Sequence, residues 1–254
     1  MKGEPITLEA LAAALALPPG PPSRRIAKST LADFVPTGAD RKLIDGKLAR
    51  LDWLAAINPA ATGVPSGEVD GLVVDTINVI AARTRGPASP RLAEILHRAI
   101  PKPVVLLYSE EGSDMGATLC LAPKRSAERE IGRTVLTALF DTGPLTQAEE
   151  GFLAELALPR LPSRDLASLY AGLIERVEAL KVSRAGERPF RLATSMTEQA
   201  AWRTTLGEIA QLEGEVAQLA AAIRKERRLS AKVALGEKVR QAKSRMDENR
   251  MLLK

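Results

Sequence analysis

The stretch that decides the fold runs from residue 90 to residue 122 and reads PRLAEILHRAIPKPVVLLYSEEGSDMGATLCLA. Its first part, residues 90–100, predicts a helix. Residues 103–109 (PVVLLYS) form an apolar run of the length of a buried strand, and residues 116–122 (GATLCLA) predict a second strand that pairs with it across an acidic turn. A helix followed by two paired strands indicates a mixed α/β layer.

The N-terminal flank adds helices and a strand to this layer. Residues 7–17 predict a short helix that ends at the PPGPP cluster, because proline cannot continue a helix. Residues 37–40 resemble a capping box, and apolar residues follow at helical spacing, so one helix is expected to reach Asn58 and Pro59. The β-branched stretch 69–82 predicts one long strand, and residues 61–65 carry a weaker strand signal.

The C-terminal flank becomes helical. A further short strand is expected within residues 133–140, then helices over 145–158 and 164–182 and a linker over 183–195. From residue 196 onward, apolar residues follow an a/d-like spacing that breaks at 226–230 and resumes in another register. The segment is either one long helix with a stutter or a helical hairpin, and we favour the hairpin because it covers more apolar surface.

These elements indicate an α+β protein. A mixed α/β N-terminal domain, with a strand order compatible with a restriction-nuclease-like core that lacks catalytic residues, precedes helices and a C-terminal hairpin or coiled coil. The expected divisions are an N-terminal helix with a Pro-rich linker over 1–22, the α/β domain over 23–144, a helical segment and linker over 145–195, and the C-terminal helices over 196–254.

The composition of the 254-residue chain excludes several kinds of chemistry. It contains one His and one Cys, which cannot build a zinc site of four such ligands or an internal disulfide. A catalytic triad could use only His97 as its histidine. A histidine at the C-terminal end of a helix is more often a cation that the helix dipole stabilises. Phosphate-binding and dinucleotide-binding glycine motifs are missing from the sequence. We expect no cofactor, no bound metal, no membrane span and a cytoplasmic protein.

Positive charge is concentrated at the C-terminal end. Residues 1–195 hold 24 basic and 23 acidic residues, whereas residues 223–254 hold 11 basic and 4 acidic residues. Such a cluster suits phosphates or an acidic partner, although Lys-rich and Arg-rich helices are also common on solvated surfaces. The candidate contacts are Arg224, Lys225, Arg227, Arg228, Lys232, Lys238, Arg240, Lys243 and Arg245, together with Lys124 and Arg125 near a strand end.

Smaller groups of residues carry weaker signals. Arg129 continues the basic group that begins at Lys124. A nucleic-acid backbone could be contacted by Arg24, Arg25 and Lys28, but an ordinary polar loop between two secondary-structure elements has a similar composition. Cys120 lies in an apolar run and is expected to be a small buried side chain.

Four stretches together resemble the bacterial family called domain of unknown function 4391. They are RIAKSTL (25–31), HRAIPKPVVLLY (97–108), LAPKR (121–125) and IRKERRLSAKVALGEKVRQAKSRM (223–246). The most specific match is the last block, where Lys225-Glu226-Arg227 and residues 231–236 follow the family's two charged steps, with Gly236 where asparagine is common. The resemblance implies no catalytic motif. It implies a setting beside helicases and DNA methyltransferases in phage-defence or restriction-modification-like clusters.

The resemblance and the missing catalytic clusters favour a non-catalytic accessory or scaffolding subunit of such a system. Its expected partner is a helicase or DNA methyltransferase encoded nearby, with DNA backbone contact or oligomerisation through the C-terminal helices as further expectations. The apolar face that would bind the partner consists of Ile209, Leu212, Val216, Leu219 and Ile223.

Two alternatives remain open. A Mg²⁺-dependent nuclease of restriction type would draw on Glu68, Asp70 and Asp75, but no lysine follows Asp75 at the required spacing, so Lys102 or Lys124 would have to supply it in space. The other alternative is a stand-alone DNA-binding module. The low aromatic content argues against base stacking on single strands.

Overall fold

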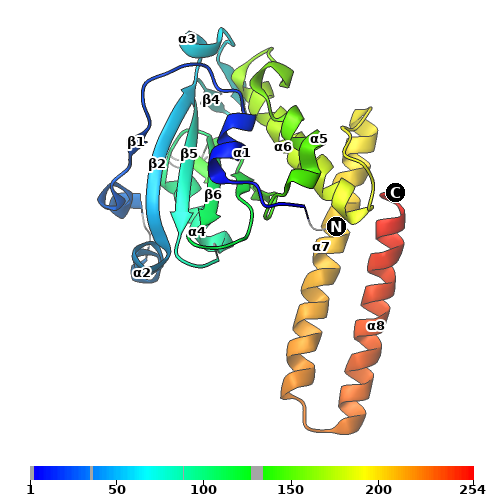
Figure 1. Ribbon diagram of the computed structural model, residues 1–254. Helices are drawn as coiled ribbons and strands as arrows, with labels where there is room; N and C mark the ends of the chain where they lie inside the picture. The colour runs from blue at the N-terminus through cyan, green and yellow to red at the C-terminus, as the bar shows by residue number, and fades with distance from the viewer. Residues whose placement is uncertain (1–2, 35–36, 88, 127–133) are drawn as a thin grey trace. The chain divides into compact units, whose positions relative to one another are not determined.

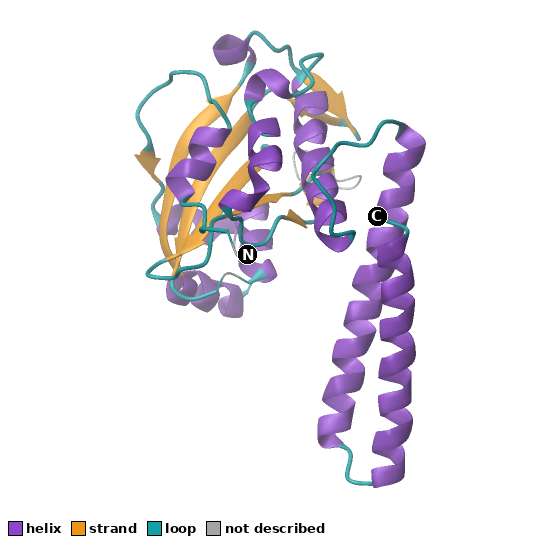
Figure 2. Ribbon diagram, turned by 45° about the vertical axis from the view of Figure 1, so that its right-hand side comes forward, coloured by secondary structure: helices purple, strands orange, loops and turns teal. Residues whose placement is uncertain are grey.

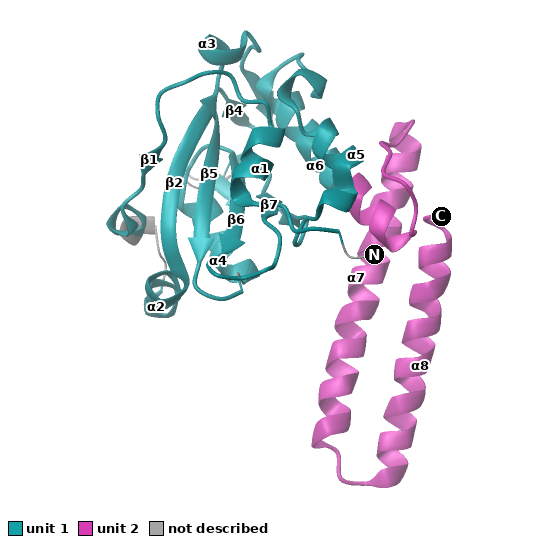
Figure 3. Cartoon of the chain, in the orientation of Figure 1, with its two compact units in different colours: residues 1–177 teal, residues 178–254 magenta. Residues whose placement is uncertain are grey.

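The computed structural model describes residues 3–34, 37–87, 89–126 and 134–254. The chain forms two compact units, residues 1–177 and residues 178–254 (Figure 3). Sequence patterns place the last division at 195/196, whereas the contacts within the chain divide it inside a helix, α6 (Leu166–Ala185). Arg129 falls outside the described residues.

A six-stranded mixed sheet forms the centre of the first unit (Figure 1). Its order is β1 (Arg24–Arg25), β2 (Leu48–Ile57), β5 (Ile77–Thr84), β6 (Val104–Glu110), β7 (Thr118–Leu121) and β10 (Phe140–Asp141). The central neighbours β5 and β6 are parallel, and the other neighbouring pairs are antiparallel. This confirms the mixed α/β layer.

The parallel pair is joined by α4 (Pro90–Ala99), as residues 90–122 predict. Ser89 caps this helix by accepting a hydrogen bond from the backbone N–H of Leu92, and Pro90 occupies the first turn, where its missing N–H is harmless. The expected strands 103–109 and 116–122 are present as β6 and β7, paired antiparallel with Val105 opposite Leu121.

Helices cover both faces of the sheet (Figure 2). On one face, α4 and α2 (Gly38–Lys47) pack Leu96 and Ile44 against strand residues that include Leu106. On the other face lie α1 (Leu8–Ala14), α5 (Glu150–Glu155) and the first part of α6. The Tyr170 hydroxyl of α6 donates to the carbonyl of Val104. Burial on both faces explains why β6 is apolar along most of its length.

The expected helix over residues 40–58 is half wrong. The helix α2 ends at Lys47, and β2 continues directly from Leu48. Apolar residues in this stretch fit a helical spacing and also the core side of a strand, where Leu48 and Leu51 are buried. Pairing with β1 on one side and β5 on the other decides the outcome, because it provides backbone hydrogen bonds on both edges of β2.

The expected strands over residues 61–65 and 69–82 also differ from the structure. The first is a helical turn, α3 (Pro59–Thr62). The second is divided into β3 (Gly67–Val69), β4 (Leu72–Val74) and β5. Asp70 and Gly71, with φ of 50° and 71°, form the tight turn between β3 and β4. An Asp-Gly pair is a strong hairpin signal, since both turn residues need positive φ.

Shorter elements complete the first unit. Two of them, β8 (Lys124–Ser126) and β9 (Thr134–Leu136), pair as a separate small sheet, and η1 (Lys28–Phe34) follows β1. The short strand expected over 133–140 is confirmed by β9 and β10, apart from residue 133, which is not described. The expected helix 145–158 is broken into η2 (Gln147–Glu149), α5 and η3 (Leu158–Arg160), and the expected helix 164–182 is confirmed as α6.

The second unit is dominated by a helical hairpin of α7 (Met196–Lys225) and α8 (Leu229–Met251) (Figure 1). The hairpin interpretation is therefore confirmed over a single long helix. Ser195 caps α7, and Glu226 stabilises the connection by accepting hydrogen bonds from the backbone N–H groups of Arg227 and Arg228 at 2.7 and 2.8 Å. Within the described ranges, no helix combines the length and apolarity needed to cross a bilayer.

Candidate functional site

The base of the hairpin, near the start of α7 and the end of α8, is its best-packed part. Trp202, Ile209 and Leu253 form a buried cluster with Ala179 and Val182 of α6. Two guanidinium groups, those of Arg188 and Arg191, lie 4.7 and 5.0 Å from the centre of the Trp202 ring. Such cation–π contacts add attraction beyond burial of the ring. The base is therefore a small core in its own right.

Packing continues along the middle of the hairpin with fewer residues. Leu212 of α7 meets Ala242 and Met246 of α8, with Val216 packed at the edge of this cluster. On the surface, Asn249 donates to a Glu208 carboxylate oxygen at 3.0 Å. Ile209 and Leu212, expected to bind a partner, are thus buried inside the hairpin, so they hold α7 and α8 together.

In the distal part of the hairpin, the apolar side chains are only partly buried or are exposed. Leu219 and Ile223, also expected on the partner-binding face, are half-buried there. At the start of α8, Leu229 and Val233 expose 77% and 66% of their surface. Large aliphatic side chains with this exposure contribute little to the stability of the hairpin, because they remain in contact with water. Exposed apolar side chains therefore lie at both ends of the hairpin, since Met196, Met251 and Leu252 are also exposed at the base, but only those of the distal end lie beside a dense group of cations.

The same distal end carries a dense group of cations, which we name the basic tip. The basic tip consists of five exposed residues, Arg224, Lys225, Arg227, Arg228 and Lys232. Its one acidic residue is Glu226. Hydrogen bonds from the backbone N–H groups of Arg228 and Arg227 lower the pKa of the Glu226 carboxyl, so it stays ionised at neutral pH. Formal charges of five cations and one carboxylate leave +4 at the tip.

The remaining predicted cations of α8 lie along the helix and not in one cluster. Arg240 donates to the Glu237 carboxylate at 2.7 Å, one helical turn away. Lys238, Lys243 and Arg245 are exposed. Exposed cations spread along a helix attract anions without forming a defined binding surface. The basic tip concentrates its positive charge on one surface.

Lys124 takes a position that the sequence did not indicate. Its side chain is buried, and its ammonium group donates to the backbone carbonyls of Ile100 and Lys102, the latter at 2.8 Å. These carbonyls follow the end of α4, where a cation is favoured by the helix dipole. Burial lowers the pKa of the Lys124 ammonium to about 7. Lys124 is therefore bound inside the unit, while its neighbour Arg125 is half-exposed in β8.

Only some of the residues considered for a nuclease centre lie close together in the structure. Lys102 forms an ion pair with Asp75 at 2.7 Å, on the surface between β4 and β5. Asp70 lies in the β3–β4 turn, at the other end of the three-residue strand β4 from Asp75. Among the described residues, no three His, Cys, Asp or Glu side chains gather where they could hold a metal ion.

His97 and Cys120 are both buried in the first unit. Burial lowers the pKa of the His97 imidazole to about 3, and the nearby positive charge of Lys124 contributes to this shift. A neutral, buried imidazole packed between helix and sheet has no access to a substrate. Cys120 lies in the same core cluster as Leu106, in agreement with its expected role as a small apolar side chain.

Two surface features were missed by sequence reasoning. Leu229 and Val233 of α8 lie outside the apolar spacing that resumes at Leu235, and this break in register was the available signal. The other feature is Arg50, which lines a pocket together with Arg25 and Lys28. No sequence pattern could have joined them, since β1 and β2 are brought side by side only by the fold.

The comparisons with known proteins give one result. No curated protein and no solved structure matches the chain. The restriction-nuclease-like core thus stays a prediction. The sequence profile of the family described as Domain of unknown function (DUF4391) matches residues 20–246, which include the sheet, α6 and nearly the whole hairpin. The chain therefore belongs to the DUF4391 family.

Proposed function

We propose that the protein is a non-catalytic accessory subunit that binds a partner protein through the distal end of its C-terminal hairpin. The proposed partner is a helicase or DNA methyltransferase of a bacterial defence or restriction-modification-like system. The observation that carries the proposal is the basic tip with Leu229 and Val233 exposed beside it.

The distribution of packing along the hairpin supports this role. Buried clusters around Ile209 and Leu212 hold the base and the middle. Beyond Val216 the seam is only half-buried. The exposed aliphatic side chains at the start of α8 suit helix-mediated recognition, in which an amphipathic helix supplies apolar anchors to a groove.

The mixture of charge and apolar surface favours a protein over DNA as the bound partner. DNA phosphates attract Arg and Lys but give no reason to expose aliphatic side chains. Leu229 lies directly after Arg228, and Val233 directly after Lys232. Apolar anchors surrounded by charged side chains are the usual arrangement of a protein interface. The complementary surface is expected to be acidic around an apolar centre.

Co-expression with any helicase or DNA methyltransferase encoded beside the protein tests the proposal. Wild-type chain is compared with a Leu229→Glu/Val233→Glu variant. The matched control is Met196→Glu/Met251→Glu, which removes two exposed apolar side chains (79% and 60%) from the other end of the hairpin and adds the same charge. All four side chains are exposed, so each variant should keep the wild-type melting temperature.

The expected result is co-purification of a helicase or methyltransferase with wild type and with the control, and at least tenfold weaker binding to the Leu229→Glu/Val233→Glu variant. The association should survive nuclease treatment. Loss of the complex with nuclease, or equal binding by all three chains, contradicts the proposal. Loss with nuclease would instead favour the stand-alone DNA-binding module.

One observation favours the nuclease as a second candidate. The ion pair between Asp75 and Lys102 joins a carboxylate and a lysine that lie far apart in the sequence. Such a pair is part of what a restriction-type centre needs. Mg²⁺-dependent cleavage of DNA by the purified chain that disappears in Asp75→Asn would support this function. Equal residual cleavage in wild type and variant would point to a contaminant.

A further inference from the structure

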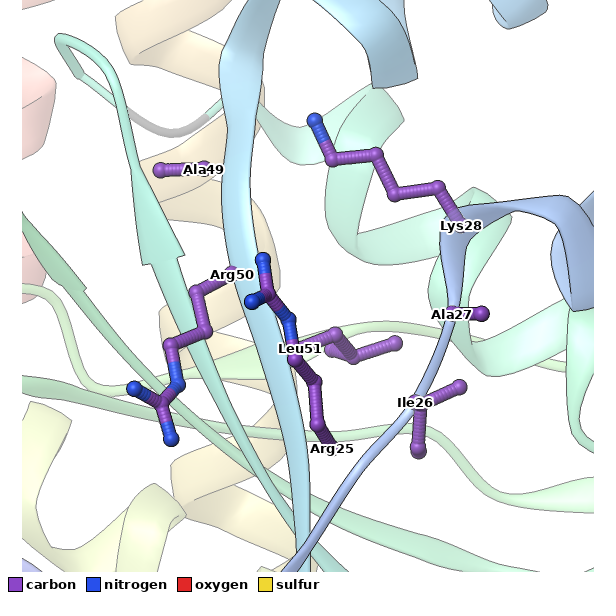
Figure 4. Close-up of a pocket in the computed structure, with 7 residues that line it drawn as sticks. All are labelled: Arg25, Ile26, Ala27, Lys28, Ala49, Arg50 and Leu51. Atoms are coloured by element: carbon purple, nitrogen blue, oxygen red, sulfur yellow. The ribbon is translucent and has the colours of Figure 1, made fainter.

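An edge of the six-stranded sheet holds a basic pocket far along the chain from the hairpin. The pocket has a volume of about 370 Å³ and lies between β2 and the segment that runs from β1 into η1 (Figure 4). Three of its lining side chains are cations: Arg25, Lys28 and Arg50. They come from β1, from the first residue of η1 and from β2.

The charge of this pocket is only partly compensated. Arg50 donates its Nε–H to the carboxylate of Asp52 at 2.6 Å, which uses one of five N–H donors of the guanidinium. Within the described parts of the chain, Arg25 and Lys28 make no side-chain hydrogen bond or ion pair. Counting Asp52 with the three cations leaves a formal charge of +2 around the pocket.

Several other cations of the same unit are paired with carboxylates. Arg83 forms an ion pair with Glu9 at 2.5 Å, and Arg91 forms one with Asp40 at 2.7 Å. Lys102 is paired with Asp75. The basic pocket is different because two cations without partners among the described residues share one concave surface, where like charges raise the local positive potential and attract an anion.

The floor of the pocket is apolar. Ile26 packs against the core cluster, and Leu51 is fully buried. The backbone N–H of Ile26 donates to the carbonyl of Leu51 at 2.8 Å, so β1 and β2 fix the spacing of the pocket walls. A small concave site with an apolar floor and a few polar groups at its rim is the usual form of a ligand site.

We propose that the basic pocket binds the phosphate ester of a nucleotide unit. Arg25, Lys28 and Arg50 contact the phosphate oxygens, and the partly exposed Ile26 side chain contacts the sugar or the base. Arg guanidinium groups bind phosphate with paired N–H donors, and Lys adds a compact positive charge. The nucleotide unit is supplied by a free nucleotide or by a nucleic-acid strand, and these sources share the same phosphate chemistry.

Binding of three probes to the full chain tests the proposal: AMP, a fluorescent single-stranded oligonucleotide and inorganic phosphate. The test variant is Arg25→Ala/Lys28→Ala. The matched control is Arg41→Ala/Lys42→Ala, which removes two exposed cations of α2 that do not line the pocket and gives the same change in net charge. Wild-type hairpin sequence is kept throughout, so any anion binding by the basic tip is common to all chains.

We expect AMP or the oligonucleotide to bind at least tenfold more weakly to the test variant and within twofold of wild type to the control. A strand as the source predicts that the slope of log affinity against log salt falls by about 0.7 for each phosphate that the variant no longer neutralises. If the source is a free nucleotide, only AMP should bind differently to the test variant and the control. Binding of neither probe, discrimination of inorganic phosphate only, or equal effects of both double variants overturns the proposal and leaves the partner-binding role of the hairpin untouched.

Discussion

Lys124 and His97 are buried in the core, although lysine and histidine are residue types expected on a protein surface or in a functional site. The Lys124 ammonium group donates hydrogen bonds to the backbone carbonyls of Ile100 and Lys102 and not to a carboxylate. His97 is completely buried on α4. Both groups are held in an environment that disfavours their charged forms, so each links folding stability to pH.

Lys124 predicts a rise of stability with pH above neutrality. Burial lowers the pKa of its ammonium from 10.5 to about 7, so between these values the unfolded chain binds more protons than the folded chain. The free energy of unfolding therefore increases with pH, by roughly 2 kcal/mol between pH 7 and pH 9. Urea unfolding at both pH values should show this increase in wild type and lack it in Lys124→Met. Parallel behaviour of the two proteins would contradict the buried position.

His97 predicts a loss of stability in mild acid. Its pKa falls from 6.5 to about 3 on folding, so below pH 6.5 the unfolded chain takes up a proton that the folded chain refuses. Through this group alone, the free energy of unfolding drops by about 2 kcal/mol between pH 7.5 and pH 5. His97→Leu should reduce the drop by this amount in urea unfolding at both pH values. An unchanged drop would show that the imidazole is protonated in the folded protein.

Among the elements, the sequence predicts those whose apolar pattern has one interpretation. The run Val104–Leu107 fits a buried strand and little else, and the structure buries it on both faces. Residues 48–57 carry a pattern that fits helix and strand alike, and only pairing with β1 and β5 selects the strand. The Asp70-Gly71 turn was readable in principle, but the β-branched residues on either side concealed it.

The hairpin itself predicts a gradient of stability along α7. Ile209 is buried in the base cluster, whereas Leu219 is half-buried beyond Val216. Ile209→Ala should cost about 2–4 kcal/mol, and Leu219→Ala less than about 1 kcal/mol, because the second change leaves little cavity. Chemical unfolding measures both values. Amide hydrogen exchange should be slowest near Ile209 and fastest near Leu229. Equal costs at the two positions would contradict the gradient.

In the whole molecule, the candidate surfaces arise from different levels of organisation. The cations of the basic tip were predictable because Arg224, Lys225, Arg227 and Arg228 are close in sequence. The basic pocket was not, since Arg25 and Arg50 meet only through the pairing of β1 with β2. The division of the chain inside α6 also depends on packing, because Trp202 and Leu253 cover Ala179 and Val182.

This packing decides how the central claim is best tested. Deleting residues 196–254 would remove Trp202 and Leu253 and expose the end of α6, so a loss of binding would have two explanations. Replacing residues 217–238 with a short glycine-rich turn removes the basic tip, Leu229 and Val233 but keeps the clusters around Ile209 and Leu212.

The most direct measurement is the affinity of this shortened chain for the helicase or methyltransferase that co-purifies with wild type, determined with purified proteins after nuclease treatment. The account predicts a folded chain with a wild-type melting transition of the first unit and at least a hundredfold loss of affinity. Wild-type affinity of the shortened chain would contradict the account, because the distal hairpin would then have no part in binding the partner.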